Sequence, residues 1–148
     1  MSVKIPRECT EPISAPRIVC KEKGRTMTFL NGARRAVLRH KVDSCAELRH
    51  LLEDSHPGSQ VRLCDYLVVE QNSTEHYVEL KGKDVEHAVK QIESTIRHLW
   101  EGRVPIHCWI ISSESPRISG FQKFANRLAK QFRAKLVIRT NAHECRLT

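Results

Sequence analysis

The sequence predicts an α/β domain in which a mixed central sheet, preceded by an N-terminal β-hairpin, is flanked by helices. Two segments, residues 84–99 and 119–132, repeat apolar side chains in steps of three and four, as helices with one buried face do. Short strand-like runs lie around them at residues 106–112 and 135–139. The first run is almost wholly apolar, as in a sheet covered on both faces. A chain of 148 residues suits one domain, residues 1–148.

The N-terminal part is expected to hold an irregular arm followed by the hairpin. Residues 1–23 contain three prolines and show no periodicity, which predicts the arm. The stretch "TMTFL" at residues 26–30 reads as a strand. Asn31-Gly32 follows, the strongest two-residue hairpin signal, and predicts a return strand over residues 34–42.

The middle of the chain predicts a short helix and then two strands. Asp43 or Ser44 caps the helix, and Ser44 with Glu47 matches a capping box. The expected buried face of this helix consists of Cys45, Leu48, Leu51 and Leu52. Residues 63–69 and 76–81 then read as strands joined by the turn-forming residues "QNST".

The charge, hydropathy and cysteine spacing of the chain indicate its class of partner and its cellular compartment. Lys and Arg number 25 against 17 Asp and Glu, a formal net charge of +8, and this balance favours a polyanion partner such as nucleic acid. No apolar run is long enough to cross a membrane, and residues 1–10 lack the apolar segment of a signal peptide. The six cysteines form no CxxC pair. We therefore expect a reduced, cytoplasmic protein without a membrane partner.

Two carboxylates are expected to face each other across the strands at residues 63–69 and 76–81. If the turn is centred on Asn72, residues whose numbers sum to 144 lie opposite one another, and Asp65 pairs with Glu79. Two such carboxylates repel unless a cation lies between them, and oxygen ligands suit Mg²⁺ or Mn²⁺. Lys81 shares the face of Glu79 and would position the attacking water, lower its pKa or hold the scissile phosphate. Gln91, on one flank of the next helix, would hold a metal-bound water or a phosphate oxygen.

These residues resemble the signature of the PD-(D/E)xK nuclease superfamily. "CD" at residues 64–65 and "ELK" at residues 79–81 carry the resemblance, which spans roughly residues 26–139 and extends to small stand-alone bacterial members. It implies a restriction-endonuclease-like core that contains a helix, three strands, a helix, a strand, a helix and a strand. It also implies that Asp65 and Glu79 are metal ligands, that Lys81 is the catalytic lysine, and that Gln91 is the glutamine of a QxxxY motif.

The chain departs from the family pattern at two positions, and one ligand stays open. Cys64 replaces the motif's proline, and Thr95 replaces the tyrosine of QxxxY. Some members of the superfamily add an acidic ligand from the first helix. Here the candidates are Asp43, Glu47 and Glu53, and the sequence does not choose among them.

The expected activity is Mg²⁺- or Mn²⁺-dependent hydrolysis of phosphodiester bonds in DNA, with RNA as an alternative. The residues expected to contact nucleic acid are Arg34, Arg35, Arg39, Lys41 and Lys83. The family resemblance leaves open a homodimer or a component of a larger defence or repair system. The competing interpretation is a catalytically inactive nuclease-fold binding module, either an immunity or adaptor protein or a nucleic-acid binder.

Overall fold

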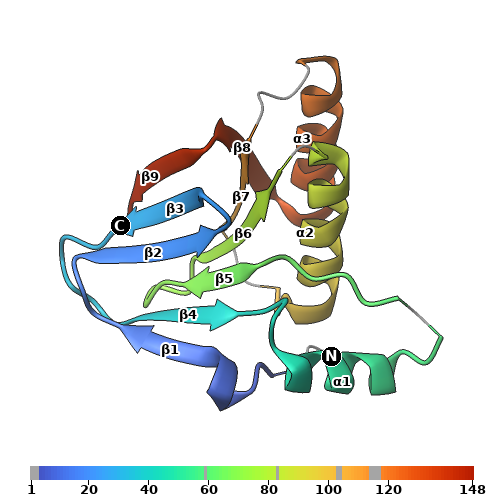
Figure 1. The fold of residues 1–148 in the computed structure, drawn as a ribbon, viewed down its shortest axis with the longest axis horizontal. Coiled ribbons are helices and arrows are strands. Elements are labelled where there is room, and N and C mark those ends of the chain that lie inside the picture. The colour runs from blue at the N-terminus through green and yellow to red at the C-terminus, as the bar shows by residue number, and fades with distance from the viewer. Residues whose placement is uncertain (1–3, 59, 83, 103–104, 114–117) are drawn as a thin grey trace.

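The computed structural model describes residues 4–58, 60–82, 84–102, 105–113 and 118–148, with residues 118–120 described by their backbone alone. The chain is an α/β protein with a six-stranded mixed sheet, a three-stranded sheet and three helices (Figure 1). The α/β class and the mixed central sheet confirm the coarse prediction from the sequence, although a second sheet and not a helix covers one face of the larger sheet.

The larger sheet has the strand order β1-β4-β5-β6-β7-β8. Its strands are β1 (Thr10–Ile13), β4 (Val37–Lys41), β5 (Tyr66–Val69), β6 (Glu75–Lys81), β7 (Ile106–Ser112) and β8 (Ala134–Thr140). Pairing is antiparallel from β1 to β6 and parallel from β6 to β8. The parallel pairs require crossover connections, and α2 (Val85–Leu99) and α3 (Ile118–Phe132) supply them.

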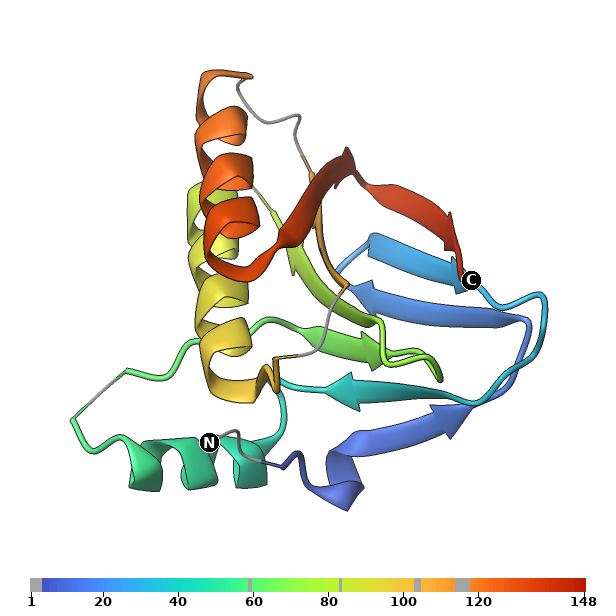
Figure 2. The ribbon, with the colours of Figure 1, turned by 180° about the vertical axis from the view of Figure 1, so that it is seen from behind.

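The smaller sheet has the order β2-β3-β9, with strands β2 (Arg17–Glu22), β3 (Arg25–Leu30) and β9 (Ala142–Arg146). A 3₁₀ turn (Arg7–Cys9) and the helix α1 (Ala46–Ser55) complete the elements. From behind, α2 and α3 lie side by side (Figure 2). The Arg127 side chain of α3 donates a hydrogen bond from Nε to Glu93 Oε1 of α2, at 2.9 Å.

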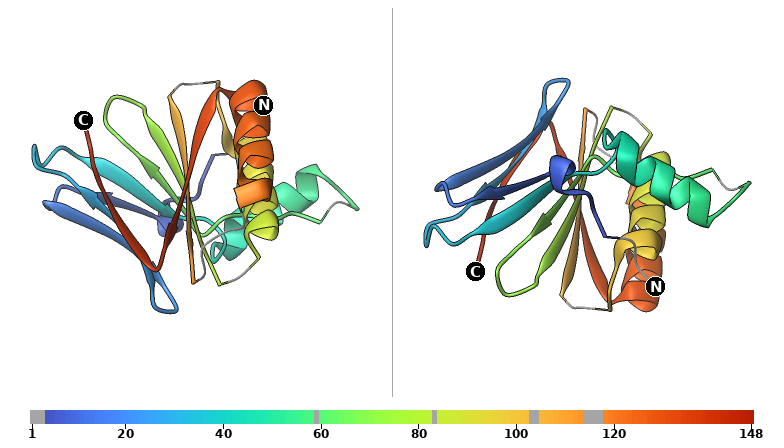
Figure 3. Two further views of the ribbon diagram at one scale, coloured as in Figure 1. Left: turned by 90° about the horizontal axis from the view of Figure 1, so that it is seen from above. Right: turned by 90° about the horizontal axis from the view of Figure 1, so that it is seen from below.

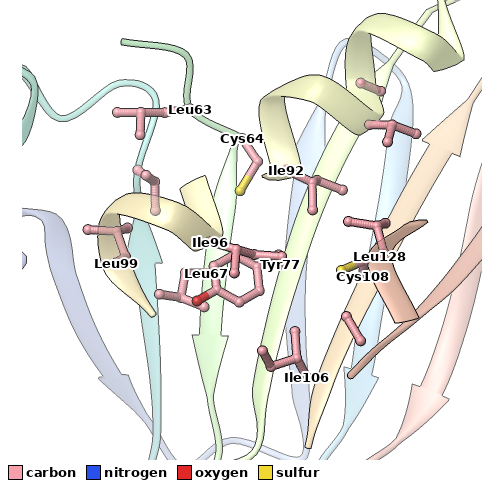
Figure 4. Packing of buried hydrophobic residues seen from close by; sticks show 14 of the residues in the cluster. Leu63, Cys64, Leu67, Tyr77, Ile92, Ile96, Leu99, Ile106, Cys108 and Leu128 are labelled. Atoms are coloured by element: carbon pink, nitrogen blue, oxygen red, sulfur yellow. The ribbon is translucent and has the colours of Figure 1, made fainter. Parts of the chain in front are cut away.

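The larger sheet separates two apolar cores, so that the molecule has three layers (Figure 3). Successive strand residues point to opposite faces. Leu67 and Tyr77 therefore face α2, where they pack with Ile92 and Ile96 (Figure 4). Val68 and Val78 face the smaller sheet and pack in the second core, whose other members include Ile18, Met27 and Phe29.

The prediction of an irregular arm over residues 1–23 is wrong from residue 7 onward, where the chain forms the 3₁₀ turn, β1 and all of β2. The positions of Pro12 and Pro16 explain why these prolines are compatible with the strands. Pro12 is in β1, an edge strand, where an absent N–H costs no ladder hydrogen bond on the open side. Pro16 precedes β2.

The predicted hairpin between residues 26–30 and 34–42 is also wrong, because β3 pairs with β2 and with β9. The N-terminal hairpin turns instead at Lys23-Gly24, whose φ values of 44° and 83° are the positive values that a two-residue turn needs. Asn31-Gly32 carries the chain from one sheet to the other. Asn31 is 3% exposed, and its side chain donates a hydrogen bond to the Arg35 carbonyl at 2.8 Å. Asn31 therefore stabilises the connection between β3 and β4 and not a hairpin turn.

The local predictions around β5, β6 and α2 are confirmed. Tyr66 pairs with Val78, and their numbers sum to 144 as the register requires. Asp84 caps α2, where its carboxylate accepts a hydrogen bond from the backbone N–H of His87.

Two details of α1 differ from the expectation, and β9 was not predicted. Cys45 is the N-cap of α1, without a side-chain capping bond, so the capping box of Ser44 and Glu47 is not formed. Leu51 is 44% exposed and does not belong to the buried face.

No described helix is both long and apolar enough to span a membrane.

Cys9 and Cys45 form a disulfide, which contradicts the expectation that all six cysteines are reduced. Their Cα atoms are 5.8 Å apart although 36 positions separate them in the sequence. The sequence separation of these two cysteines therefore does not predict that they form a disulfide. The disulfide ties the 3₁₀ turn ahead of β1 to the start of α1.

We expect the disulfide to stabilise the fold by about 2–4 kcal/mol, because it removes conformational freedom from a long loop of the unfolded chain. Thermal unfolding of the oxidised protein with and without a reducing agent measures this, and Cys9→Ser should reproduce the loss. Cys145→Ser, which removes a free thiol, is the matched control and should leave the unfolding temperature nearly unchanged. Alkylation of all six cysteines in the unfolded, unreduced protein would contradict the disulfide.

Candidate active site

A cavity of about 270 Å³ opens where β5 begins and β6 ends, beside the first turns of α2. The structure brings all four predicted site residues to it, namely Asp65, Glu79, Lys81 and Gln91. The other residues that line it are Glu22, Lys23, Arg25, Asp43, Leu80 and Gly82.

Asp65 and Glu79 face each other as the register predicts. β5 begins at Tyr66, later than the predicted start at Leu63, so Asp65 lies immediately before the strand. The ladder ends at the pair of Tyr66 and Val78, and the same register extended by one residue places Asp65 opposite Glu79. The Asp65 N–H donates to Glu79 Oε1 at 3.1 Å, and the Leu80 N–H donates to Asp65 Oδ2 at 2.8 Å. Each carboxylate thus receives one backbone hydrogen bond from the opposite strand.

Burial and mutual repulsion disturb the ionisation of this pair. Glu79 is 2% exposed, and burial, followed by the charge of Asp65, raises its pKa to about 9. Burial also raises the pKa of Asp65, and the nearby charges of Glu22 and Asp43 act in the same direction. A buried carboxylate in contact with a half-buried one cannot ionise cheaply while the other is charged. The pair therefore retains a proton at neutral pH unless a cation replaces it.

The helix α2 fixes the segment that carries Asp65. Gln91 Nε2 donates to the Leu63 carbonyl at 3.2 Å. One turn later, Thr95 Oγ1 accepts a hydrogen bond from the Cys64 N–H at 2.8 Å. Thr95, which stands where the resembling motif has tyrosine, thus positions the strand entry from within the core.

Gln91 leaves one polar atom unused. Its Oε1 is buried and has no hydrogen-bond partner among the described residues, although it belongs to a side chain that lines the cavity. Such orphaned acceptors are rare in folded proteins and need an explanation. A donor brought by a ligand, such as a cation-bound water, would satisfy it.

The donors suit a hard cation that keeps part of its hydration shell. In the described part of the chain, no group of three or more His, Cys, Asp or Glu side chains is arranged to hold a metal ion. Mg²⁺ needs only one or two carboxylates because it retains several waters. The pair of Asp65 and Glu79, with the unpartnered Gln91 oxygen beside it, fits that requirement.

Of the three candidates for a further acidic ligand, the structure brings only Asp43 to the cavity. Asp43 also forms an ion pair with Arg49, at 2.7 Å. Glu47 lies against Glu8, whose hydrogen bond and charge raise the pKa of Glu47. Glu53 does not line the cavity.

The residues predicted to contact nucleic acid do not form one surface. Arg34 and Arg35 are exposed in the connection before β4, whereas Lys41 is exposed at the opposite end of that strand, near Asp65. Arg39 binds within the molecule, where it donates hydrogen bonds to the Val19 carbonyl and to Glu11. The predicted contact at Lys83 lies outside the described residues.

Sequence reasoning missed the contribution of the β2–β3 hairpin to the cavity. Glu22 and Lys23 lie in the segment predicted as an irregular arm, and Arg25 lies between that arm and the predicted strand at residues 26–30. No local pattern joins residues 22–25 to Asp65, because the contact arises only when the smaller sheet packs on the larger one.

Comparison of the chain with protein-family models, with curated proteins and with solved structures found no match in any of the three.

We expect Glu79→Gln to flatten the dependence of stability on pH. Glu79 titrates near its ordinary pKa of 4.5 when unfolded and at about 9 when folded, so the folded state holds an additional proton between these values. The stability that this additional proton contributes is complete below the unfolded pKa. The free energy of unfolding then decreases as pH rises toward the folded pKa of about 9, by up to about 1.4 kcal/mol per pH unit. Urea unfolding at pH 6, 7 and 8 measures the slope.

The matched control is Glu86→Gln, which changes an exposed glutamate of α2 and should retain the wild-type slope. Saturating Mg²⁺ should also reduce the wild-type slope, because a bound cation stabilises the ionised pair. Equal slopes for wild type and Glu79→Gln would contradict the raised pKa.

Proposed function

We propose that this chain is a Mg²⁺- or Mn²⁺-dependent nuclease of the PD-(D/E)xK type, which hydrolyses phosphodiester bonds in DNA. One observation carries the proposal. The four side chains singled out by the motif, Asp65, Glu79, Lys81 and Gln91, converge on one cavity, and the carboxylate pair there needs a positive charge to ionise.

The arrangement of the strands gives partial support to the restriction-endonuclease-like core. An antiparallel β4-β5-β6 unit leads through α2 to the parallel strand β7. One feature departs from the order that the resemblance implies. Only β5 and β6 lie between α1 and α2, whereas the third antiparallel strand, β4, precedes α1.

In this proposal each residue has a distinct role. Asp65 and Glu79 would hold the cation, which when bound supplies positive charge to stabilise the additional negative charge on the scissile phosphate. Lys81 follows Glu79 by two residues on the same face of β6, so its ammonium group can hold a phosphate oxygen or orient water. As the water oxygen forms a bond to phosphorus, the water releases a proton to solvent; the bond to the leaving oxygen breaks, and that oxygen takes up a proton from solvent. Gln91 Oε1 accepts a hydrogen bond from a water in the cavity.

The test is cleavage of supercoiled plasmid, linear duplex and single-stranded DNA in the presence of Mg²⁺, Mn²⁺ or EDTA. We expect metal-dependent cleavage by the wild type and a loss of about 100-fold or more in both Glu79→Ala and Lys81→Ala. Lys130→Ala, which removes an exposed lysine from the last turn of α3, is the control and should cleave like the wild type.

Two results would contradict the proposal. Cleavage that survives both substitutions would place the activity elsewhere. Absence of cleavage by a wild type that still binds DNA would favour the binding module, a protein of similar architecture without catalysis.

A further inference from the structure

The tip of the β2–β3 hairpin, defined here as Glu22 to Arg25, forms one wall of the candidate active site. Glu22 and Arg25 are direct cross-strand partners, so their side chains project to the same side of the hairpin. Both line the cavity together with Lys23. In Figure 1 this turn points toward β6 and β7, whereas the connection from β3 to β4 lies at the far end of the smaller sheet.

The hairpin tip is held in place from both of its strands. On the β2 side, the Lys21 carbonyl accepts a hydrogen bond from Tyr66 Oη at 3.3 Å. Tyr66 directly follows Asp65 in the chain. On the β3 side, the Thr26 N–H donates to the Asn141 carbonyl at 3.0 Å, and the Asn141 N–H donates to the Ser112 carbonyl at 2.8 Å. Ser112 is the partner of Lys81 in the β6–β7 ladder. The hairpin is thus linked directly to β5, and to β6 through Asn141 and β7.

Arg25 has hydrogen-bonding capacity that the protein does not use. Its Nε atom is buried and has no hydrogen-bond partner among the described residues. A buried donor without an acceptor is costly, and a guanidinium group is always charged. Its planar fork of donors matches the oxygens of a phosphate group. An anion entering the cavity would supply the acceptor.

Lys23 occupies a turn position that does not suit lysine. Its φ of 44° lies in the left-handed region, which costs roughly 1–2 kcal/mol for an ordinary side chain and which Asn or Gly adopts more easily. The side chain nevertheless lines the cavity. An ammonium group at this position gives the hairpin tip a second cation next to Arg25.

The charges around the cavity explain why such cations are needed. Four of the residues that line it are acidic, namely Glu22, Asp43, Asp65 and Glu79. A nucleic-acid strand that approaches these carboxylates is repelled unless cations on the protein offset them. Lys81 supplies one from β6, and the hairpin tip supplies two more from the opposite wall.

We infer that the hairpin tip is the substrate-binding element of this site, in which Arg25, assisted by Lys23, binds a backbone phosphate of the strand next to the phosphate that is cut. The inference rests on the proposed nuclease function and adds a specific contact to it. Because the contact is to phosphate, it is independent of base sequence and sensitive to salt.

The test measures binding separately from cleavage. A fluorescein-labelled single-stranded oligodeoxynucleotide is titrated with Glu79→Gln protein, in which hydrolysis is blocked and an amide replaces the protonated carboxyl group of Glu79, and anisotropy gives Kd. Adding Arg25→Gln should raise Kd by about 10-fold or more, the effect of losing a charge-assisted hydrogen bond. It should also lower the slope of log Kd against log salt by about one. Arg25→Lys should recover part of the affinity, because it keeps the charge but not the fork of donors.

Two further variants complete the set. Lys23→Asn should weaken binding by a few fold while it raises the unfolding temperature, because asparagine relieves the strain of the turn. Arg17→Gln, at the other end of β2 with a side chain 57% exposed, is the matched control and should leave Kd within about twofold.

The outcomes separate this inference from the proposed function. Equal Kd for Arg25→Gln and Arg17→Gln would overturn the inference, and it would leave the nuclease standing if cleavage still depends on Glu79 and Lys81. Binding that depends on Arg25 in a protein that cleaves no DNA would support the hairpin contact and reject the nuclease. A wild type that neither binds nor cleaves would overturn both.

Discussion

Asp65 and Glu79 are held against each other by the pairing of β5 with β6, and this enforced contact between a half-buried and a buried carboxylate is the constraint on which the site depends. Each receives a backbone hydrogen bond from the facing strand, which secures its position without removing the repulsion. The helix α2 prevents relaxation, because Gln91 and Thr95 bind the chain just ahead of Asp65. Only a shared proton or a bound cation relieves the repulsion, so stability and ligand binding are coupled at this pair.

The smaller sheet has a structural role and a role at the site, and these lie at different ends of the larger sheet. Near the start of β6, His76 Nε2 donates a hydrogen bond to Glu70 Oε2 at 2.7 Å, and Trp109 Nε1 donates to His76 Nδ1 at 3.1 Å. Phe29 of β3 packs against the His76 ring, with the ring centroids 4.8 Å apart. This buried polar chain is satisfied internally, unlike the cavity at the other end of β6.

Glu70 also anchors the end of the described chain. The backbone N–H of Thr148 donates to Glu70 Oε1 at 3.2 Å. Burial acts to raise the pKa of Glu70, but the hydrogen bonds from His76 and Thr148 outweigh it and lower the pKa. The carboxylate therefore stays ionised within a fully paired network. The contrast with Glu79, whose pKa rises, shows that the partners of a buried carboxylate decide the direction of its shift.

The sequence by itself determined the elements and contacts that depend on neighbours along the chain. The helical period of residues 84–99, the apolar run of β7 and the register across the Asn72 turn are local, and they sufficed to place Asp65 opposite Glu79 and Gln91 beside them. Tertiary structure decided the rest. The strand partner of β3, the disulfide between Cys9 and Cys45 and the approach of Arg25 to the cavity all join segments far apart in sequence. They follow from the pairing of strands that are distant in sequence and from the packing of the smaller sheet on the larger one, which no turn signal or local period encodes.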